Sequence, residues 1–162
     1  MNDKWRATAT ISVASLADAE AILTLQKLAF RSEAELYNDW SLAPLMQSIE
    51  SLREEFGRST VLKATVGGRL VGSVRARQNA ETCSIGSLIV HPEFRRQGIG
   101  SQLLRDVEAR FKGASRFELF TGHRSEANLR LYQRHGYAIT RTQPRSETVT
   151  LVFLEKRAKG VL

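Results

Sequence analysis

Cysteine, proline and long hydrophobic runs are scarce in this chain of 162 residues. Cys83 is the only cysteine, which excludes an intramolecular disulfide and a cysteine-rich metal site and fits a reducing compartment. Residues 1–10 are polar and hold no apolar core, so neither a secretory signal nor a membrane span is expected there. The sequence therefore predicts a cytoplasmic protein with no membrane partner and no metal.

The length and the hydrophobic content of 42% suit one globular domain over residues 1–162. The formal net charge of +7 points to anionic partners. Residues 91–145 carry eleven basic against five acidic side chains, whereas residues 1–90 carry ten of each. Because the arginines form neither a stripe along one helix nor a basic tail, a nucleic acid partner is disfavoured.

Apolar periodicity predicts an alternation of strands and helices without linkers or repeats. A capping box at Ser15 and Asp18 opens a helix over residues 15–30, and a second helix is expected over residues 45–56, ended by Gly57. Further helices are expected over residues 103–111 and 125–136, and strands over residues 8–13, 61–66, 70–77, 83–90, 117–121, 137–142 and 148–154. Periodicity alone allows either an α/β or an α+β fold.

Residues 90–101, with the sequence VHPEFRRQGIGS, join an apolar strand to a helix through a basic turn with two glycines. Gly98 and Gly100 let the backbone approach a bulky anion, and the following helix offers unpaired N–H groups and the positive end of its dipole. A Walker loop would need Gly-Lys-Ser/Thr, and a dinucleotide fingerprint would need a third glycine where Leu103 stands. The turn therefore predicts a diphosphate site outside those two nucleotide folds.

A second motif, NLRLYQRHGY, occupies residues 128–137. Asn128 and Tyr132 are four residues apart and share one face of the predicted helix, beside a core-facing stripe with Ala127 and Leu131. A polar pair at the edge of a buried stripe can face a cleft. A core tyrosine whose hydroxyl finds a partner is the structural alternative.

Together, the turn Arg95-x-x-Gly98-x-Gly100 and the segment Asn128-x-x-x-Tyr132 resemble the signature of the GNAT N-acetyltransferase superfamily. The resemblance implies an α/β (α+β) fold with a mixed central sheet flanked by helices, and acetyl-CoA as cosubstrate. It also implies that Tyr132 is the general acid that protonates the leaving thiolate. The residues expected to bind the cofactor are Leu88, Ile89, Val90, Arg95, Arg96, Gln97, Gly98, Ile99, Gly100, Ser101 and Asn128.

The strand before the glycine turn carries two further expectations. In the family this strand bulges and leaves amides free for the cofactor, and Gly86 is compatible with that bulge and equally with ordinary pairing. Some members place a glutamate midway along the strand, but residues 83–86 hold no carboxylate. Glu81 is therefore the expected general base, acting through water, with His123 as the alternative. Cys83 fits a small buried strand residue better than a nucleophile.

Residues 33–55 hold six acidic side chains against Arg53, in the region where the family usually builds its acceptor site. Acid there suits a cationic amine, and aromatic side chains would supply cation–π walls. For Glu50 and Glu54, the solvent face of an ordinary amphipathic helix is the alternative. The expected acceptor-binding residues are Glu33, Glu35, Tyr37 and Trp40.

The sequence thus predicts an acetyl-CoA-dependent N-acetyltransferase. Its expected partners are an amine acceptor, either a small molecule or a protein amine, and a second copy of the chain in a homodimer. Two alternatives stay open at this point. An acyl-CoA-binding sensor without turnover is favoured by the missing strand glutamate and disfavoured by Tyr132, and a nucleic-acid-binding protein would show a steep salt dependence and no acetyl-CoA requirement.

Overall fold

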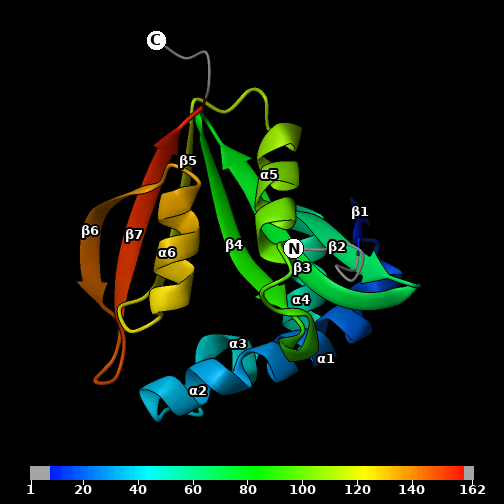
Figure 1. Cartoon of the computed structure of the whole chain (residues 1–162), viewed down its shortest axis with the longest axis horizontal. Helices are drawn as coiled ribbons and strands as arrows, with labels where there is room; N and C mark the ends of the chain where they lie inside the picture. The colour runs from blue at the N-terminus through cyan, green and yellow to red at the C-terminus, as the bar shows by residue number, and fades with distance from the viewer. Residues whose placement is uncertain (1–7, 159–162) are drawn as a thin grey trace, which may run out of the picture.

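A seven-stranded mixed sheet forms the centre of the computed structural model, which describes residues 8–158 (Figure 1). The spatial order is β1-β2-β3-β4-β5-β7-β6, and neighbouring strands are antiparallel except for the parallel pair β4 and β5. The sheet flanked by helices confirms the predicted fold class. The strands are β1 (Thr10–Val13), β2 (Thr60–Val66), β3 (Arg69–Asn79), β4 (Thr82–Val90), β5 (Arg116–Gly122), β6 (Ala138–Pro144) and β7 (Thr150–Arg157).

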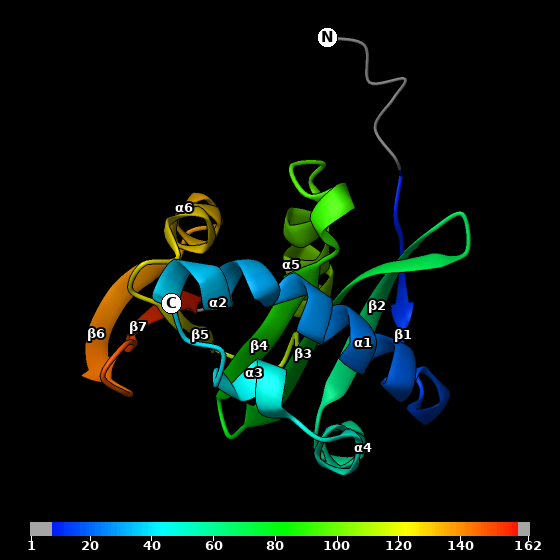
Figure 2. The same cartoon turned by 90° about the horizontal axis from the view of Figure 1, so that it is seen from below.

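Helices cover both faces of the sheet (Figure 2). Alternation along β2 shows the division, because Leu62 packs into the cluster that contains α5 whereas its neighbour Val61 packs with α1 and α4 on the other face. None of the helices in residues 8–158 is long and apolar enough to cross a bilayer. The helices are α1 (Ala19–Ala29), α2 (Arg31–Tyr37), α3 (Ala43–Met46), α4 (Ile49–Arg58), α5 (Ile99–Arg110) and α6 (Glu126–Arg134), with short 3₁₀ turns η2 (Leu16–Asp18) and η3 (Pro92–Phe94).

The sheet opens between β4 and β5, which pair only over residues 82–84 and 116–118. Beyond these residues β4 stays paired with β3 and β5 stays paired with β7, so the two strands separate toward their carboxyl ends. The α1–α2 segment crosses the molecule at this end of the sheet (Figures 1 and 2). The separation leaves facing backbone groups of β4 and β5 without a partner strand.

A bulge in β4 lies where the strands separate. Ser87 and Leu88 together stand opposite Val74 of β3, and Ser87 has a φ of +49°. Gly86 itself pairs regularly with Arg75, so the bulge that the family resemblance implied is present but falls one residue later. Its position turns the backbone of residues 87–88 away from regular pairing.

The segment between the first two predicted helices differs from expectation. α2 forms in a stretch where no helix was predicted, and the helix predicted over residues 45–56 is divided into α3 and α4. Ser48 divides them, because its hydroxyl accepts the Ser51 N–H at 3.1 Å and caps α4. Gly57 does not end α4, which continues to Arg58 and stops at the extended Ser59.

Candidate active site

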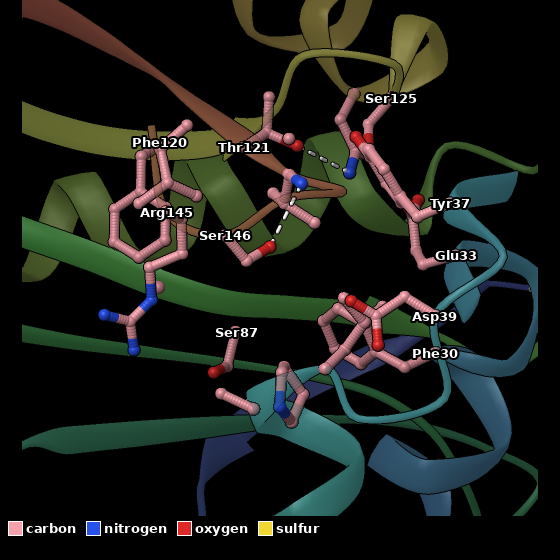
Figure 3. Close-up of a pocket in the computed structure, with 18 of the residues that line it drawn as sticks. Phe30, Glu33, Tyr37, Asp39, Ser87, Phe120, Thr121, Ser125, Arg145 and Ser146 are labelled. Carbon is pink, nitrogen blue, oxygen red and sulfur yellow. Dashed lines mark hydrogen bonds between the residues drawn. The ribbon is translucent and has the colours of Figure 1, made fainter. Parts of the chain in front are cut away.

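A cavity of about 900 Å³ lies between the separated ends of β4 and β5. Its walls come from the β4 bulge, the end of β5, α6, the loop between β6 and β7, and the segment from α1 to α3. Figure 3 shows side chains of these segments pointing toward one another. The residues expected in the site that line this cavity are Leu88, Asn128, Tyr132, Glu33 and Tyr37.

Tyr132 and Asn128 both lie on the cavity side of α6, as their spacing predicts. The Tyr132 side chain is only 6% exposed, and its ring packs against that of Tyr137 with 6.1 Å between centroids. Burial and the nearby negative charge of Glu33 raise the pKa of Tyr132 above its usual value, so the phenol keeps its proton. The Asn128 amide donates to Thr121 Oγ1 at 3.2 Å and is fixed against β5.

A directed chain of hydrogen bonds ends on Glu33. The Arg124 N–H donates to Tyr37 Oη at 2.9 Å, and Tyr37 Oη lies 2.8 Å from Ser125 Oγ. Because the Ser125 hydroxyl donates its single proton to Glu33 Oε2 at 2.7 Å, Tyr37 is the donor to Ser125. Each hydrogen bond of this series therefore has its donor on the side away from Glu33, and the Glu33 carboxylate is the final acceptor.

Ser125 stands at the N-cap of α6, where the helix predicted over residues 125–136 begins. Its side chain makes no capping hydrogen bond. Ser125 is only 5% exposed, and its hydroxyl is hydrogen-bonded to Tyr37 and to Glu33 instead. This bridge connects α2 with the start of α6 across the cavity.

The glycine turn before α5 presents open backbone donors. Gly98 is the N-cap of α5 and has a φ of +82°, which favours glycine. The Gln102 N–H makes the first bond of the helix, to the Gly98 carbonyl at 3.0 Å, so the N–H groups of residues 99–101 precede the intrahelical ladder. Gly100 adds no side chain beside these donors. Together with the helix dipole and the exposed Arg96, the turn fits an anionic diphosphate.

Arg95, one of the residues expected to bind the cofactor, is hydrogen-bonded within the protein. Its guanidinium donates to the Ala29 carbonyl at 2.8 Å and to Ser32 Oγ at 3.0 Å. The last carbonyls of a helix lack intrahelical partners, and a cation there is favoured by the dipole of α1. These hydrogen bonds link the glycine turn to the end of α1. Because α2 begins directly after α1, they also hold the start of α2 in place.

Other residues of the turn are held from within the protein. Ser101 Oγ lies 2.9 Å from His135 Nε2, and Ile99 is buried in the core. Burial and the positive charge of Arg105 lower the pKa of His135, which favours the neutral imidazole. Gln97 Oε1 is buried and, within residues 8–158, has no hydrogen-bond partner. The backbone N–H groups of residues 99–101 and the exposed Arg96 are thus the groups of the turn that suit an anionic ligand.

The three β4 residues expected at the cofactor have different surroundings. Leu88 lies in the bulge and lines the cavity. Ile89 is buried against Leu25 and Ala29 of α1, and Val90 packs on the main core. For Ile89 and Val90, the backbone is therefore the part available to a ligand.

Glu81, the expected base, is not brought to the cavity. It lies in the turn between β3 and β4, where its carbonyl accepts the Ser115 N–H at 2.8 Å. The cavity residues lie at the other end of β4, so the strand itself separates Glu81 from Tyr132. Glu35 and Trp40 are also exposed and outside the cavity wall, with Trp40 57% exposed. The helical spacing of α2 turns Glu33 toward the cavity and Glu35 away from it.

His123 and Cys83, the two alternatives for a reactive role, both make contacts within the protein. The ring of His123 lies 5.6 Å from that of Tyr37, and His123 Nδ1 accepts the Thr150 N–H at 3.0 Å. Cys83 is fully buried, and burial raises the pKa of its thiol to about 12. Its thiol therefore stays protonated near neutral pH. Within residues 8–158, no three His, Cys, Asp or Glu side chains gather as metal ligands would.

Sequence analysis missed Arg75, Arg145 and Asp39, which all line the cavity. Asp39 accepts hydrogen bonds from the Ser41 N–H at 2.9 Å and from the Thr148 hydroxyl, so it joins the α2–α3 loop to the β6–β7 loop. These bonds hold the pKa of Asp39 below its usual value. Neither arginine belongs to a motif, and no local signal distinguishes them from surface arginines.

A family model described as the acetyltransferase (GNAT) family matches residues 19–137. The chain therefore belongs to the acetyltransferase (GNAT) family.

The chain is also similar to individual proteins and to solved structures. The chain is 28% identical over 142 residues to an acetyltransferase of Pectobacterium atrosepticum, covering 86% of this chain and 89% of that protein. It is 26% identical over 144 residues to the protein YqkA of Bacillus subtilis, covering 89% of this chain but only 38% of that protein. Its fold is similar to the solved PaiA N-acetyltransferase from Thermoplasma acidophilum in complex with coenzyme A. That likeness has a TM-score of 0.77 and 18% identity, and covers 93% of this chain and 99% of the other.

Proposed function

We propose that this protein transfers the acetyl group of acetyl-CoA to a primary amine. The observation that carries the proposal is that Leu88, Asn128 and Tyr132 line one cavity at the end of β4. From there β4 leads into the glycine turn, whose open N–H groups suit a diphosphate. A single ligand with a diphosphate and a reactive arm matches this arrangement.

Acetyl-CoA would supply a thioester, in which the acetyl group is activated toward attack by an amine. The N–H groups of residues 99–101 and the side chain of Arg96 would hold its diphosphate. Leu88 and Asn128 would flank its reactive arm. The bulged backbone at Ser87 and Leu88 lacks regular pairing with β3, and free N–H groups of this kind stabilise a developing oxyanion.

Glu33 takes the part of general base that the sequence indicated for Glu81. An amine must lose a proton to attack, and a carboxylate that lines the cavity is a suitable acceptor. Ser125 holds Glu33 Oε2, which leaves Oε1 for the amine. The influence of Glu33 on the pKa of Tyr132 supports this role, because it indicates that the carboxylate lies close to the hydroxyl.

Tyr132 acts as the general acid. Burial keeps its phenol protonated at the start of each turnover, so a donor faces the sulfur that leaves. Once Tyr132 has given up its proton, its raised pKa favours rapid reprotonation. The base and the acid then come from α2 and α6, which the Tyr37–Ser125–Glu33 chain holds together.

The test is acetyl transfer by the purified protein to a panel of primary amines that includes polyamines, amino acids, and peptides with a free amino terminus or a lysine. We expect amine-dependent release of free thiol together with acetylated acceptor in the mass spectrum. Binding of coenzyme A without turnover of any amine would instead favour the acyl-CoA-binding sensor. The homodimer, the cytoplasmic location and the single-domain organisation stay predictions.

A further inference from the structure

The cavity carries opposite charges at its opposite ends (Figure 3). Glu33 lies at one end beside Tyr37, with Asp39 on the same side, whereas Arg145 lies beside Phe120 at the other end. Asp39 already accepts hydrogen bonds from the protein. Glu33 accepts one from the neutral Ser125 and, among the described residues, has no cation within ion-pairing distance.

Arg75 adds a second guanidinium to the end that holds Arg145. It extends from β3, donates to Ser87 Oγ, and donates to Gln47 Oε1 at 3.4 Å. Arg75, Ser87 and Phe120 line one smaller adjoining hollow, and Figure 3 shows Phe120 beside Arg145. Burial lowers the pKa of Arg75, although the charge of Glu55 opposes this effect from beyond ion-pairing distance, and an arginine stays charged under such conditions.

The Arg75 guanidinium has N–H donors beyond those used in its two hydrogen bonds. Both of its hydrogen-bond partners are neutral, and across residues 8–158 no carboxylate approaches Arg75 closely enough for an ion pair. A half-buried charge without a counter-ion is costly, and an anionic ligand would remove part of that cost. The planar fork of a guanidinium also matches the two oxygens of a carboxylate.

We propose that the acceptor carries a carboxylate several bonds away from its amine, as a short peptide or an ω-amino acid does, with its carboxylate on Arg75 and Arg145 and its amine at Glu33. This inference rests on the N-acetyltransferase function proposed above. It replaces the expectation of a simple cationic amine. Of the six acidic residues at positions 33–55, only Glu33 and Asp39 line the cavity.

The first experiment compares short peptides and ω-amino acids with their carboxamides, and 6-aminohexanoic acid with pentylamine, its decarboxylated amine. Each pair differs by one negative charge. We expect kcat/KM to be about tenfold or more higher for the best acid than for its amide and its amine. Amides or amines that react as well as the acids would overturn the inference.

The second experiment removes the guanidinium groups one at a time. Arg75→Gln and Arg145→Gln should each lower kcat/KM for the best acid by about tenfold and change it little for the matched amine. Arg110→Gln is the control, because Arg110 is exposed on α5 and outside the cavity. Arg145 lies in an exposed loop, so its variant keeps the test valid if Arg75→Gln fails to fold. Equal losses for acid and amine in a folded Arg145→Gln variant would contradict the proposal.

Calorimetry with coenzyme A present separates this inference from the proposed function. Binding of a short peptide or an ω-amino acid that weakens in the Arg145→Gln variant, without acetyl transfer, would support the carboxylate site and refute the transferase. Acetylation of amines with no preference for acids would support the transferase and refute the carboxylate site. Failure of every acid in the panel to bind would also refute the carboxylate site.

Discussion

The phenol of Tyr37 rests directly on Gly122 at the end of β5. A methyl group on Gly122 would overlap the Tyr37 hydroxyl oxygen and would lie 2.6 Å from Cζ. The absent side chain is therefore what lets Tyr37 reach Ser125 and the Arg124 N–H. Through these contacts, the lack of a side chain at Gly122 fixes the position of Tyr37 and, through Ser125, that of Glu33.

Gly122→Ala should displace Tyr37 and lower the stability of the fold. Overpacking of this kind costs about 1–3 kcal/mol, and the Tyr37–Ser125–Glu33 chain should be disturbed as well. Thermal unfolding will show a lower Tm, and acetyl transfer will show a higher KM for the acceptor. Gly113→Ala is the matched control, since its added methyl would meet only Gln78 at an ordinary 3.8 Å. Equal melting of the two variants would disprove the steric argument.

Glu33→Gln should slow acetyl transfer by roughly 10² to 10⁴, the usual contribution of a general base. The substitution preserves the size of the side chain and removes the proton acceptor, and single-turnover acetyl transfer measures the loss. Glu35→Gln removes an exposed carboxylate two residues away and should leave the rate unchanged. A fully active Glu33→Gln enzyme would eliminate Glu33 as the base.

Tyr132→Phe should lower kcat by at least about tenfold with little change in coenzyme A affinity. The variant removes one hydroxyl and keeps the ring that packs against Tyr137. Single-turnover acetyl transfer and calorimetry with coenzyme A measure the two effects separately. A loss of affinity instead of rate would mean that Tyr132 positions the cofactor and does not transfer the proton.

Gly100→Val should abolish coenzyme A binding while the fold persists. A Cβ at this position has ordinary contacts, 3.5 Å to Leu131 Cδ2 and 3.9 Å to Val90 Cγ2, but a larger side chain would stand beside the open N–H groups of the turn. Gly100→Ala should weaken binding less. Gly57→Val controls for a β-branched residue in a helix, because a Cβ at Gly57 meets nothing within 4 Å. Calorimetry that finds unchanged affinity in folded Gly100→Val would rule out the diphosphate site.

Stability should fall as the pH rises above about 9. The buried Cys83 thiol has its pKa raised from 9.0 to about 12, so the unfolded chain releases this proton first. The stabilisation is complete below pH 9.0 and is lost toward pH 12, with a slope of at most about 1.4 kcal/mol per pH unit. Denaturant unfolding between pH 8 and 10 should give a flatter pH dependence for Cys83→Ala. An identical slope in the variant would contradict this account.

Local sequence patterns were enough to predict much of the fold and half of the candidate active site. The glycine turn and the pair Asn128 and Tyr132 follow from spacing, because residues four apart share a helix face and glycine permits a left-handed turn. The strands were predicted well, since most of them carry their own apolar pattern, although β6 is exposed along its whole length. The error at Gly57 has the same origin, because a glycine signal is only local and α4 continued through it.

The sequence by itself therefore determined the family, the order of the elements and the cofactor-facing motifs. Only the tertiary structure decided that Glu33 and not Glu81 lines the cavity with Tyr132, that Arg95 donates to a carbonyl at the end of α1, and that Arg75 lines the cavity. Such relationships join segments far apart in the chain, since Arg95 and Ala29 are separated by 66 residues and Ser125 and Glu33 by 92. Whether these residues come together depends on where β4 and β5 separate and on which helix crosses the opening. Long-range packing decides both, and no local sequence pattern does.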